Sequence, residues 1–227
     1  NDPNFMREVW KMPVWQGVTA VRKKRVYLSP HLPFGWFDYP PGATPLDPDE
    51  AAGLIPSHIA NHAQLNEWEM VNIIEGERWA FGRRHRNLLG NEFVCALHKR
   101  MFGNTWRWAG KFRTTEKNIG VDPLRIQPAL HDLCEDVKTQ LEFKSYPLDE
   151  IAARFSHRLV AIHPFANGNG RLSRTMADLL LAQHGAPRFT WGAGNLVADG
   201  EVRQRYLAAL RAADAKDYGP LLASGRS

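Results

Sequence analysis

Cysteine is scarce in this chain of 227 residues, which contains only Cys95 and Cys134. Both fall in segments with a helical pattern, so we expect small core side chains in a reducing compartment and no disulfide. Long hydrophobic runs are missing too, and no stretch approaches the roughly 18 apolar residues of a membrane span. Because the first residues lack the apolar segment of a signal peptide, a cytoplasmic location without membrane attachment is the expectation.

Two common phosphate-binding patterns are also missing. The chain has no Gly-x-x-x-x-Gly-Lys-Ser/Thr motif, and residues 168–173 lack the third glycine of a dinucleotide-binding fingerprint. The composition, with 44% hydrophobic and 23% charged residues, is typical of a globular protein with a full core. The formal net charge of +5 is uneven, since residues 1–40 hold six basic and three acidic side chains. Such an arm suits nucleic acid or an acidic partner, while a solvated leader fits equally well, so direct binding of nucleic acid is not our expectation.

Helical periodicity dominates the rest of the chain and predicts an all-α fold. Asp47-Pro48-Asp49-Glu50 is typical of a helix start, with Asp47 as the cap, and Gly53 and Pro56 should keep that helix short. Residues 112–121 break the helical pattern, and we interpret them as a small β-hairpin or flap. Further helices are expected at about 57 or 65 to 84, 91–101 with Asn91 as its cap, 129–144, 149–162, 171–185, 201–213 and 217–222.

The run from His163 to Arg174 reads His-Pro-Phe-Ala-Asn-Gly-Asn-Gly-Arg-Leu-Ser-Arg. Pro164 disfavours helical geometry at His163, so the preceding helix should end there. Gly168 and Gly170 let backbone amides approach a ligand where the next helix begins. Because an unperturbed imidazole has a pKa near 6.5, His163 is the candidate base for a hydroxyl that attacks a phosphoryl group. An isolated histidine would more simply cap the helix end.

Arg171 and Arg174 lie three residues apart, on one face of the first turn of that next helix. Their guanidinium groups and the amides of residues 168–170 make an expected anion site, because a guanidinium binds two phosphate oxygens at once. An exposed pair between Arg174 and Asp178 is the structural alternative, and both arrangements can hold in different states.

This run resembles the signature of the Fic (Fic/Doc) family, His-Pro-Phe-x-Asp/Glu-Gly-Asn-Gly-Arg-x-x-Arg, and fits it at eleven of twelve positions. Residues 108–113, Trp-Ala-Gly-Lys-Phe-Arg, resemble the family's segment before its substrate flap, and residues 206–218 resemble its closing helices. Residues 38–85 are similar to a branch known as mobile mystery protein B. The resemblance implies three parts: a basic N-terminal extension (1–40), an N-terminal helical region (41–86) and a Fic domain core (87–227).

The resemblance implies an activity and its residues. Such proteins typically transfer AMP from ATP to a hydroxyl side chain, with Mg²⁺. Here His163 and Arg171 would be catalytic, and Gly168, Asn169, Gly170, Arg171 and Arg174 would bind the nucleotide. Asn167 stands at the position of the acidic metal ligand and offers Mg²⁺ or Mn²⁺ only a neutral carbonyl. Reduced activity, a changed metal preference or a different transferred group are therefore open.

Two further segments receive roles from the resemblance. Val71 to Gly76 is similar to an inhibitory motif, Ser/Thr-x-x-x-Glu-Gly/Asn, in which the glutamate pairs with the second arginine of the signature. Glu75 would then restrain Arg174, or else form a surface pair with Arg78. The target flap would include Thr114, Thr115, Glu116 and Lys117 and would align the target's backbone as an edge strand does. Tyr206 and Asn195 would contact the adenosine, although a core role suits Tyr206 equally well.

The expected function is that of a protein adenylyltransferase, with ATP as co-substrate and a Ser, Thr or Tyr hydroxyl of a target protein as acceptor. One alternative is a Doc-like phosphotransferase that holds the nucleotide the other way round. Another is a weakly catalytic nucleotide-binding or partner-binding module of a toxin-antitoxin-like pair, with an antitoxin-like or DNA-binding regulator as partner.

Overall fold

The computed structural model describes residues 46–59, 62–192 and 199–227, and within them the fold is all-α, as predicted. No strand is assigned among these residues, and an isolated antiparallel bridge joins Leu54 to Trp106. The basic extension expected at residues 1–40 and Asn195 lie outside the described residues. The elements are α2 (Pro48–Ala51), α3 (His62–Phe81), α4 (Asn91–Phe102), the 3-10 turn η2 (Pro123–Arg125), α5 (Ile126–Glu142), α6 (Leu148–Ile162), α7 (Asn169–Gln183), α8 (Asp199–Asp214) and α9 (Gly219–Arg226).

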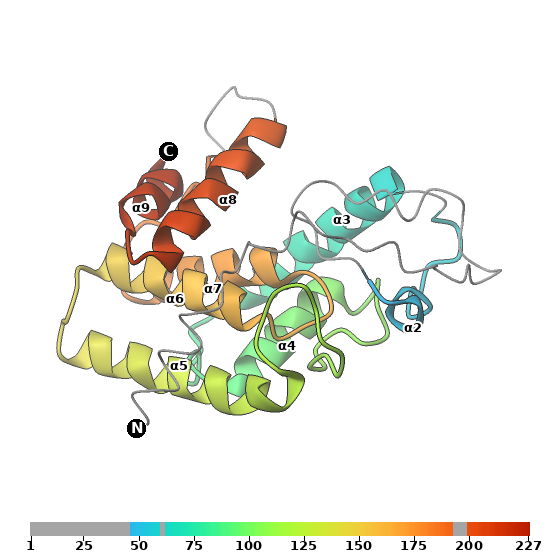
Figure 1. Ribbon diagram of the computed structural model, residues 1–227, viewed down its shortest axis with the longest axis horizontal. Helices are drawn as coiled ribbons and strands as arrows, with labels where there is room; N and C mark the ends of the chain where they lie inside the picture. Colours follow the sequence, from blue (N-terminus) through green and yellow to red (C-terminus); the bar gives the residue numbers. More distant parts are fainter. Residues whose placement is uncertain (1–45, 60–61, 193–198) are drawn as a thin grey trace.

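Helices α6 and α7 pack side by side at the centre of the molecule (Figure 1). Helix α5 packs on α6, α8 and α9 pack together over it, and α3 lies along α4. The apolar residues of α6 recur three or four positions apart, which gives the helix a buried stripe. Ile151, Phe155, Leu159 and Ile162 form that stripe and are all buried. The central helix pair therefore presents the loop between its members, residues 163–168, on a rigid core.

The expected start of α2 is confirmed. Asp47 caps the helix, and its backbone amide donates to Glu50 Oε2 at 2.8 Å. The cap expected for α4 is wrong, because Gly90 is the residue before the helix and Asn91 is its first residue. The Asn91 amide instead donates to the Gln127 carbonyl at 3.0 Å, so its hydrogen bond ties α4 to the start of α5.

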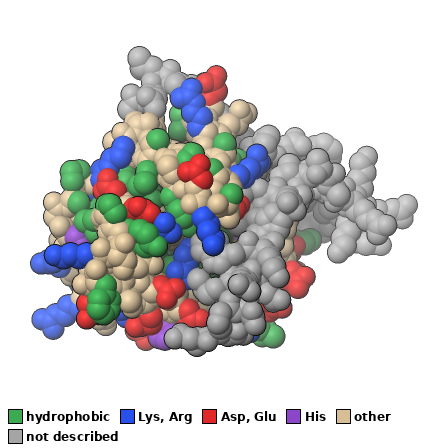
Figure 2. All heavy atoms as spheres, turned by 60° about the vertical axis from the view of Figure 1, so that its left-hand side comes forward, with side chains coloured by type: hydrophobic (Ala, Val, Ile, Leu, Met, Phe, Trp, Pro, Cys, Tyr) green, Lys and Arg blue, Asp and Glu red, His purple; other side chains and the backbone are tan. Residues whose placement is uncertain are grey.

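Both cysteines are free thiols, as expected. Burial raises the pKa of Cys95 and of Cys134 to about 11, which keeps them protonated and unreactive. None of the helices in the described chain combines the length and the hydropathy that a membrane span requires. On the face shown in Figure 2, basic and acidic side chains are interspersed over the described surface.

Candidate active site

The corner at His163 forms as the proline after it predicts. His163 ends α6 in the left-handed region, with φ 53° and ψ 60°, and its amide donates to the Leu159 carbonyl at 3.3 Å. A left-handed conformation is uncommon for a residue with a β-carbon and persists only where neighbours enforce it. The Pro164 carbonyl next to it accepts a hydrogen bond from the Arg113 amide at 2.9 Å. The imidazole is therefore set at a fixed corner, with only 5% of the residue exposed.

The environment of His163 favours the neutral imidazole. Burial is the main cause that lowers its pKa to about 3, and the positive charges of Arg113 and Lys117 act in the same direction. A hydrogen bond to the Val160 backbone opposes these effects. Near neutral pH the ring is therefore uncharged and has a lone pair that can accept a proton.

The loop after His163 is closed by the side chain of Asn169. Its Oδ1 accepts from the Phe165 amide at 2.9 Å, and its Nδ2 donates to the Phe165 carbonyl at 2.7 Å. Gly168 adopts φ 81°, and a β-carbon there would lie 2.6 Å from the Phe102 ring. Only glycine combines that angle with so close an approach. Helix α7 then begins at Asn169, and the first amides of a helix have no partner within it, which leaves them available to an anion.

His98 on α4 links the same loop to the segment at Gly110. Its Nδ1 accepts from the Gly110 amide at 2.9 Å, so the proton must lie on Nε2, which donates to the Asn167 carbonyl at 3.0 Å. The ring stacks on Phe165 with a centroid separation of 3.8 Å. Burial is the main cause that lowers the pKa of His98 to about 3, which agrees with this neutral tautomer. Nothing in the local pattern around residue 98 predicts this role.

The side chain of Asn167 serves the loop itself. Its Oδ1 accepts from the Gly168 amide at 2.5 Å and lies 3.5 Å from Nη2 of Arg171. A neutral oxygen that is already hydrogen-bonded beside a guanidinium is a poor ligand for Mg²⁺. Among the described residues, no group of three or more His, Cys, Asp or Glu side chains is placed to hold a metal ion. The residues present therefore do not fit a metal held by the protein alone.

The two arginines of the signature are held differently. Arg171 Nη1 donates to Glu69 Oε2 on α3 at 2.6 Å, and its guanidinium lies 4.9 Å from the Phe102 ring centroid. The guanidinium of Arg174 lies 4.9 Å from the ring centroid of Tyr206, which is buried. The alternative pair with Asp178 is not the one observed, because that carboxylate accepts from the Phe189 amide and from the Trp191 indole at 3.1 Å.

Sequence reasoning missed two residues near these arginines. Glu69 is buried, and a carboxylate in register with Leu65 and Ala80 on the inner face of α3 is a signal that the sequence does contain. Arg203 lies one turn before Tyr206 on α8. Arg203 is exposed, and partial desolvation together with the nearby charges of Arg174 and Arg171 lowers its pKa, so it adds a further positive charge near the two signature arginines.

The predicted flap is an irregular loop and not a β-hairpin. Its two ends do not pair with each other, because each pairs with the corner at His163. The Arg113 amide donates to the Pro164 carbonyl at 2.9 Å, and the Val121 amide donates to the Ile162 carbonyl at 3.2 Å. Because these backbone amides bond to the corner at His163, the two ends of the segment do not form the paired hydrogen bonds of a β-hairpin.

The side chain of Arg113 fixes the shape of this loop. It donates to the carbonyls of His163 at 2.7 Å, Thr115 at 2.8 Å and Val121. The residue is buried, and burial is the main cause that lowers its pKa. Gly120 lies against it with φ 107°, where a β-carbon would be 2.6 Å from the Arg113 guanidinium and 2.7 Å from His163 Cβ.

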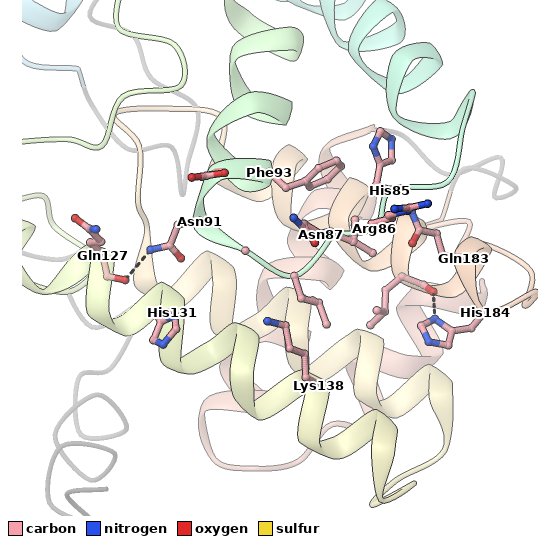
Figure 3. A pocket seen from close by; sticks show the side chains of 15 residues that line it. His85, Arg86, Asn87, Asn91, Phe93, Gln127, His131, Lys138, Gln183 and His184 are labelled. Atoms are coloured by element: carbon pink, nitrogen blue, oxygen red, sulfur yellow. Dashed lines mark hydrogen bonds between the residues drawn. The ribbon is translucent and has the colours of Figure 1, made fainter.

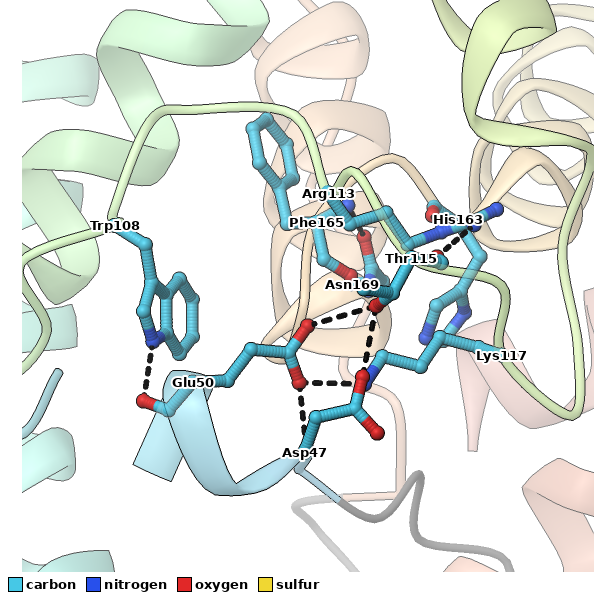
Figure 4. A network of polar contacts seen from close by, with 9 residues as sticks. All are labelled: Asp47, Glu50, Trp108, Arg113, Thr115, Lys117, His163, Phe165 and Asn169. Atoms are coloured by element: carbon cyan, nitrogen blue, oxygen red, sulfur yellow. Dashed lines mark hydrogen bonds and ion pairs between the residues drawn. The ribbon is translucent and has the colours of Figure 1, made fainter. Parts of the chain in front are cut away.

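The middle of the loop is held from outside by α2 (Figure 4). Lys117 Nζ contacts Asp47 Oδ2 at 2.8 Å and Glu50 Oε2 at 2.5 Å, and Thr115 Oγ1 donates to Asp47 Oδ2 at 2.8 Å. The Lys117 side chain is only 3% exposed. Thr114, Thr115 and Glu116, the other residues predicted for the flap, are exposed.

Glu75 lies on the exposed side of α3. The neighbouring Gly76 is buried, and a β-carbon there would meet Met101 at 2.7 Å, so Gly76 allows α3 to approach α4 closely. In the part of the chain that the structure describes, no ion pair joins Glu75 to Arg174 or to Arg78. The inhibitory role stays a prediction.

A hollow of about 770 Å³ lies away from this corner, between the loop before α4, helix α5 and the end of α7 (Figure 3). None of the predicted site residues lines it. Two of its histidines are engaged with the backbone, His85 with the Ala80 carbonyl and His184 with the Leu180 carbonyl, both at 2.8 Å. These contacts indicate that the two rings stabilise helix ends.

The site thus combines a neutral histidine at a helix-to-loop corner with the first amides and two arginines of the next helix. A comparison with family models finds a match over the segment that contains it. Residues 88–181 match the model described as the Fic/DOC family, so this part of the chain is similar to that family.

Curated proteins are also similar to part of this chain. The chain is 28% identical over 134 residues to the protein adenylyltransferase fic-1 of Caenorhabditis elegans, covering 57% of this chain and 25% of that protein. It is 30% identical over 138 residues to the protein adenylyltransferase Fic of Drosophila grimshawi, covering 57% and 26%. The chain thus spans about a quarter of the length of the curated relatives that it matches.

Solved structures share the fold. Fic-1 (residues 134–508) from C. elegans superposes with a TM-score of 0.60 at 24% identity, covering 77% of this chain and 51% of that chain. The N-terminal Fic domain of a putative cell filamentation protein from Bartonella quintana, solved with bound ADP, gives 0.57 at 18% identity and covers 74% and 86%.

Proposed function

We propose that this protein transfers the AMP part of ATP to a hydroxyl side chain of a target protein. The observation that supports this most directly is the neutral imidazole of His163 at the corner beside the N-terminus of α7. An acceptor hydroxyl and a nucleotide phosphate need these two groups at neighbouring positions, because one removes a proton and the other binds anionic oxygens.

The chemistry follows from the residues. The acceptor oxygen attacks the α-phosphorus of ATP and its proton passes to the His163 imidazole, while the bond to the bridging oxygen breaks and pyrophosphate leaves with that electron pair. The first amides of α7 and the Arg171 guanidinium stabilise charge on the phosphate oxygens. Arg174 binds the terminal phosphates, and Arg203 adds positive charge to the same region.

ATP as co-substrate is supported by the relatives. The curated relatives are named protein adenylyltransferases, and two similar solved structures contain bound ADP or AMPPNP. A divalent cation, Mg²⁺ or Mn²⁺, would enter with the nucleotide, since Asn167 is a poor ligand. We expect Asn167→Asp to raise Mg²⁺-dependent transfer because a carboxylate supplies the missing charged ligand. Equal or lower transfer by that variant would count against a metal role for this position.

The acceptor is a Ser, Thr or Tyr side chain of another protein, and residues 114–117 align its backbone. The proposal includes an inhibitory role for Glu75, which would pair with Arg174. It also includes an antitoxin-like or DNA-binding regulator as a partner protein.

Intact-protein mass spectrometry after incubation with ATP and Mg²⁺ or Mn²⁺ tests the proposal. We expect the mass of AMP to be added to wild type or to Glu75→Gly, with more in Glu75→Gly if the restraint exists. Addition of a phosphate mass would favour the phosphotransferase instead. ATP binding without any added mass in either form, with a target present, would favour a nucleotide-binding module.

A further inference from the structure

We propose that Glu69 is a positioning residue that holds the Arg171 guanidinium at the phosphate site. This inference rests on the proposed function, because Arg171 is there assigned to the nucleotide's phosphates. Both carboxylate oxygens of Glu69 are engaged: Oε1 accepts from Trp106 Nε1 at 2.7 Å, and Oε2 accepts from Arg171 Nη1 at 2.6 Å. The residue is 2% exposed, so this is a buried contact between α3 and the start of α7.

Trp106 makes Glu69 a fixed anchor. The indole is 1% exposed, and its N–H needs an acceptor inside the protein. One turn along α3, the Asn72 amide reaches Thr105 Oγ1 at 3.4 Å, so two side chains of α3 are joined to the segment before Trp108. A rotation of Glu69 away from Arg171 would leave a buried charge and a buried N–H unpaired, which strongly disfavours it.

Arg171 keeps donors for a ligand while it is anchored. Among the described residues, Glu69 accepts from Nη1 alone, and Nη2 makes a long contact of 3.5 Å with Asn167 Oδ1. The side chain of Arg171 is 30% exposed, and the Phe102 ring supports its face. Because a guanidinium has five N–H donors in one plane, it can bind a carboxylate on one edge and a phosphate on another.

These features distinguish an anchor from a block. A blocking carboxylate has to occupy the donors that the phosphate needs, and it has to be able to leave them. Glu69 occupies one nitrogen and is held by Trp106. Glu69 therefore restricts the rotamers of Arg171 before the nucleotide binds. As a result, Arg171 loses less conformational entropy on binding.

The first test is the affinity for ATP, measured by calorimetry, together with AMP transfer. Glu69→Gln keeps the length of the side chain and an acceptor for Trp106 but removes the charge that holds Arg171. We expect its affinity to fall roughly tenfold, as for other groups that orient a ligand-binding residue, and transfer to fall with it. Glu67→Gln, an exposed change two residues earlier on α3, is the matched control and should stay within about twofold of wild type.

The second test is whether Glu69 acts through Arg171. In an Arg171→Gln background, Glu69→Gln should change the affinity by less than about twofold, since the group that it positions is gone. An equal loss in both backgrounds would mean that Glu69 acts elsewhere and would overturn the inference. Tighter binding or faster transfer in Glu69→Gln alone would mean that Glu69 blocks the site, which would overturn it too.

Further measurements distinguish a folding defect of the variants from a loss of ATP binding. Glu69→Asp retains the charge but withdraws it by one methylene, so if Glu69→Gln fails to fold, Glu69→Asp should still show weaker ATP binding in a folded protein. If wild type binds ATP without transferring AMP, the proposed function is wrong, but the effect of Glu69 on ATP affinity can still be measured. If wild type transfers AMP and both Glu69→Gln and Glu69→Asp bind ATP with the wild-type affinity, the positioning role of Glu69 is wrong and the proposed function stands.

Discussion

The loop at residues 163–168 and the loop at residues 113–121 lie side by side, yet they are held by different kinds of contact. The first is built into the core, where the Asn169 side chain closes it and His98 supports it from beneath. The second is fixed at its ends by Arg113, while its middle combines the exposed residues 114–116 with the buried side chain of Lys117, which pairs with Asp47 and Glu50.

This difference corresponds to the two tasks of the proposed reaction. The nucleotide is the same small molecule in every reaction, so a preformed site can bind it at a low entropic cost. A target protein has to enter and leave, and contacts on the surface can be exchanged for contacts with it. We therefore expect changes in the first loop to act on stability and ATP affinity together, and changes in the middle of the second to act on neither strongly.

The largest effect is expected from Gly168→Ala. A β-carbon at φ 81° is strained, and the Phe102 ring lies 2.6 Å from where it would be, so we expect a loss of about 2–4 kcal/mol in the free energy of unfolding and a loss of ATP affinity. Gly185→Ala is the control, because φ is 76° there and nothing lies within 4 Å. It should cost about 1 kcal/mol and leave ATP binding unchanged. Equal costs in urea unfolding would contradict the close contact with Phe102.

Arg113→Met should come next. It leaves the carbonyls of His163, Thr115 and Val121 without this donor, and we expect a loss of about 3 kcal/mol in urea unfolding. Transfer should fall further than ATP affinity, since the flap and the corner at His163 move while the start of α7 does not. Lys111→Met, an exposed change in the same segment, is the control. A stable Arg113→Met protein with normal transfer would show that the arginine does not shape the loop.

Acid should lower the free energy of unfolding through two histidines at the loop of residues 163–168. The pKa values of His98 and His163 are lowered to about 3 in the folded protein, against about 6.5 when unfolded. The unfolded chain binds these protons first, so stability is complete above pH 6.5 and is lost as the pH falls toward 3. Each histidine should contribute a slope of up to about 1.4 kcal/mol per pH unit.

His163→Ala should remove one of these two contributions, which urea unfolding between pH 7 and pH 5 will measure. At pH 5 the difference amounts to about 2 kcal/mol. An unchanged slope in the variant would indicate that His163 is protonated in the folded state.

The smallest effect is expected from Glu50→Gln. Gln keeps an acceptor oxygen for Lys117, and Lys117 keeps its ion pair with Asp47, so the free energy of unfolding should fall by about 1 kcal/mol, with ATP affinity unchanged. Hydrogen exchange in residues 114–121 should become faster, because the middle of the loop loses one of its two carboxylate partners. Glu116→Gln, an exposed change in the same loop, should not alter exchange. Exchange that stays slow after Glu50→Gln would mean that α2 does not hold the loop.

Local features of the site were predictable from the sequence. Pro164 sets the end of α6 at His163, and the glycines that follow it mark the start of α7 to within two residues. These outcomes depend on backbone preferences of adjacent residues, which a single sequence contains. The hairpin prediction was wrong because the ends of residues 112–121 find partners on the corner at His163, and the broken helical pattern carries no information about such partners.

The contacts that orient the functional groups were not predictable in this way. Glu69 and Arg171 are 102 residues apart, His98 and Asn167 are 69 apart, and Lys117 and Asp47 are 70 apart. Such pairs arise only when α3, α4 and α2 are packed against the central helices. The sequence does mark one member, since a carboxylate on the inner face of α3 must have a buried partner.

The most direct test of the account is label transfer from ATP that carries a radioactive phosphate at either the α or the γ position. With the target or by automodification, wild type or Glu75→Gly should acquire the α label and not the γ label, and His163→Ala should acquire neither while still binding ATP. Transfer of the γ label would identify a phosphotransferase. Transfer of the α label by His163→Ala at the wild-type rate would show that the histidine is not the base, which would contradict the central claim.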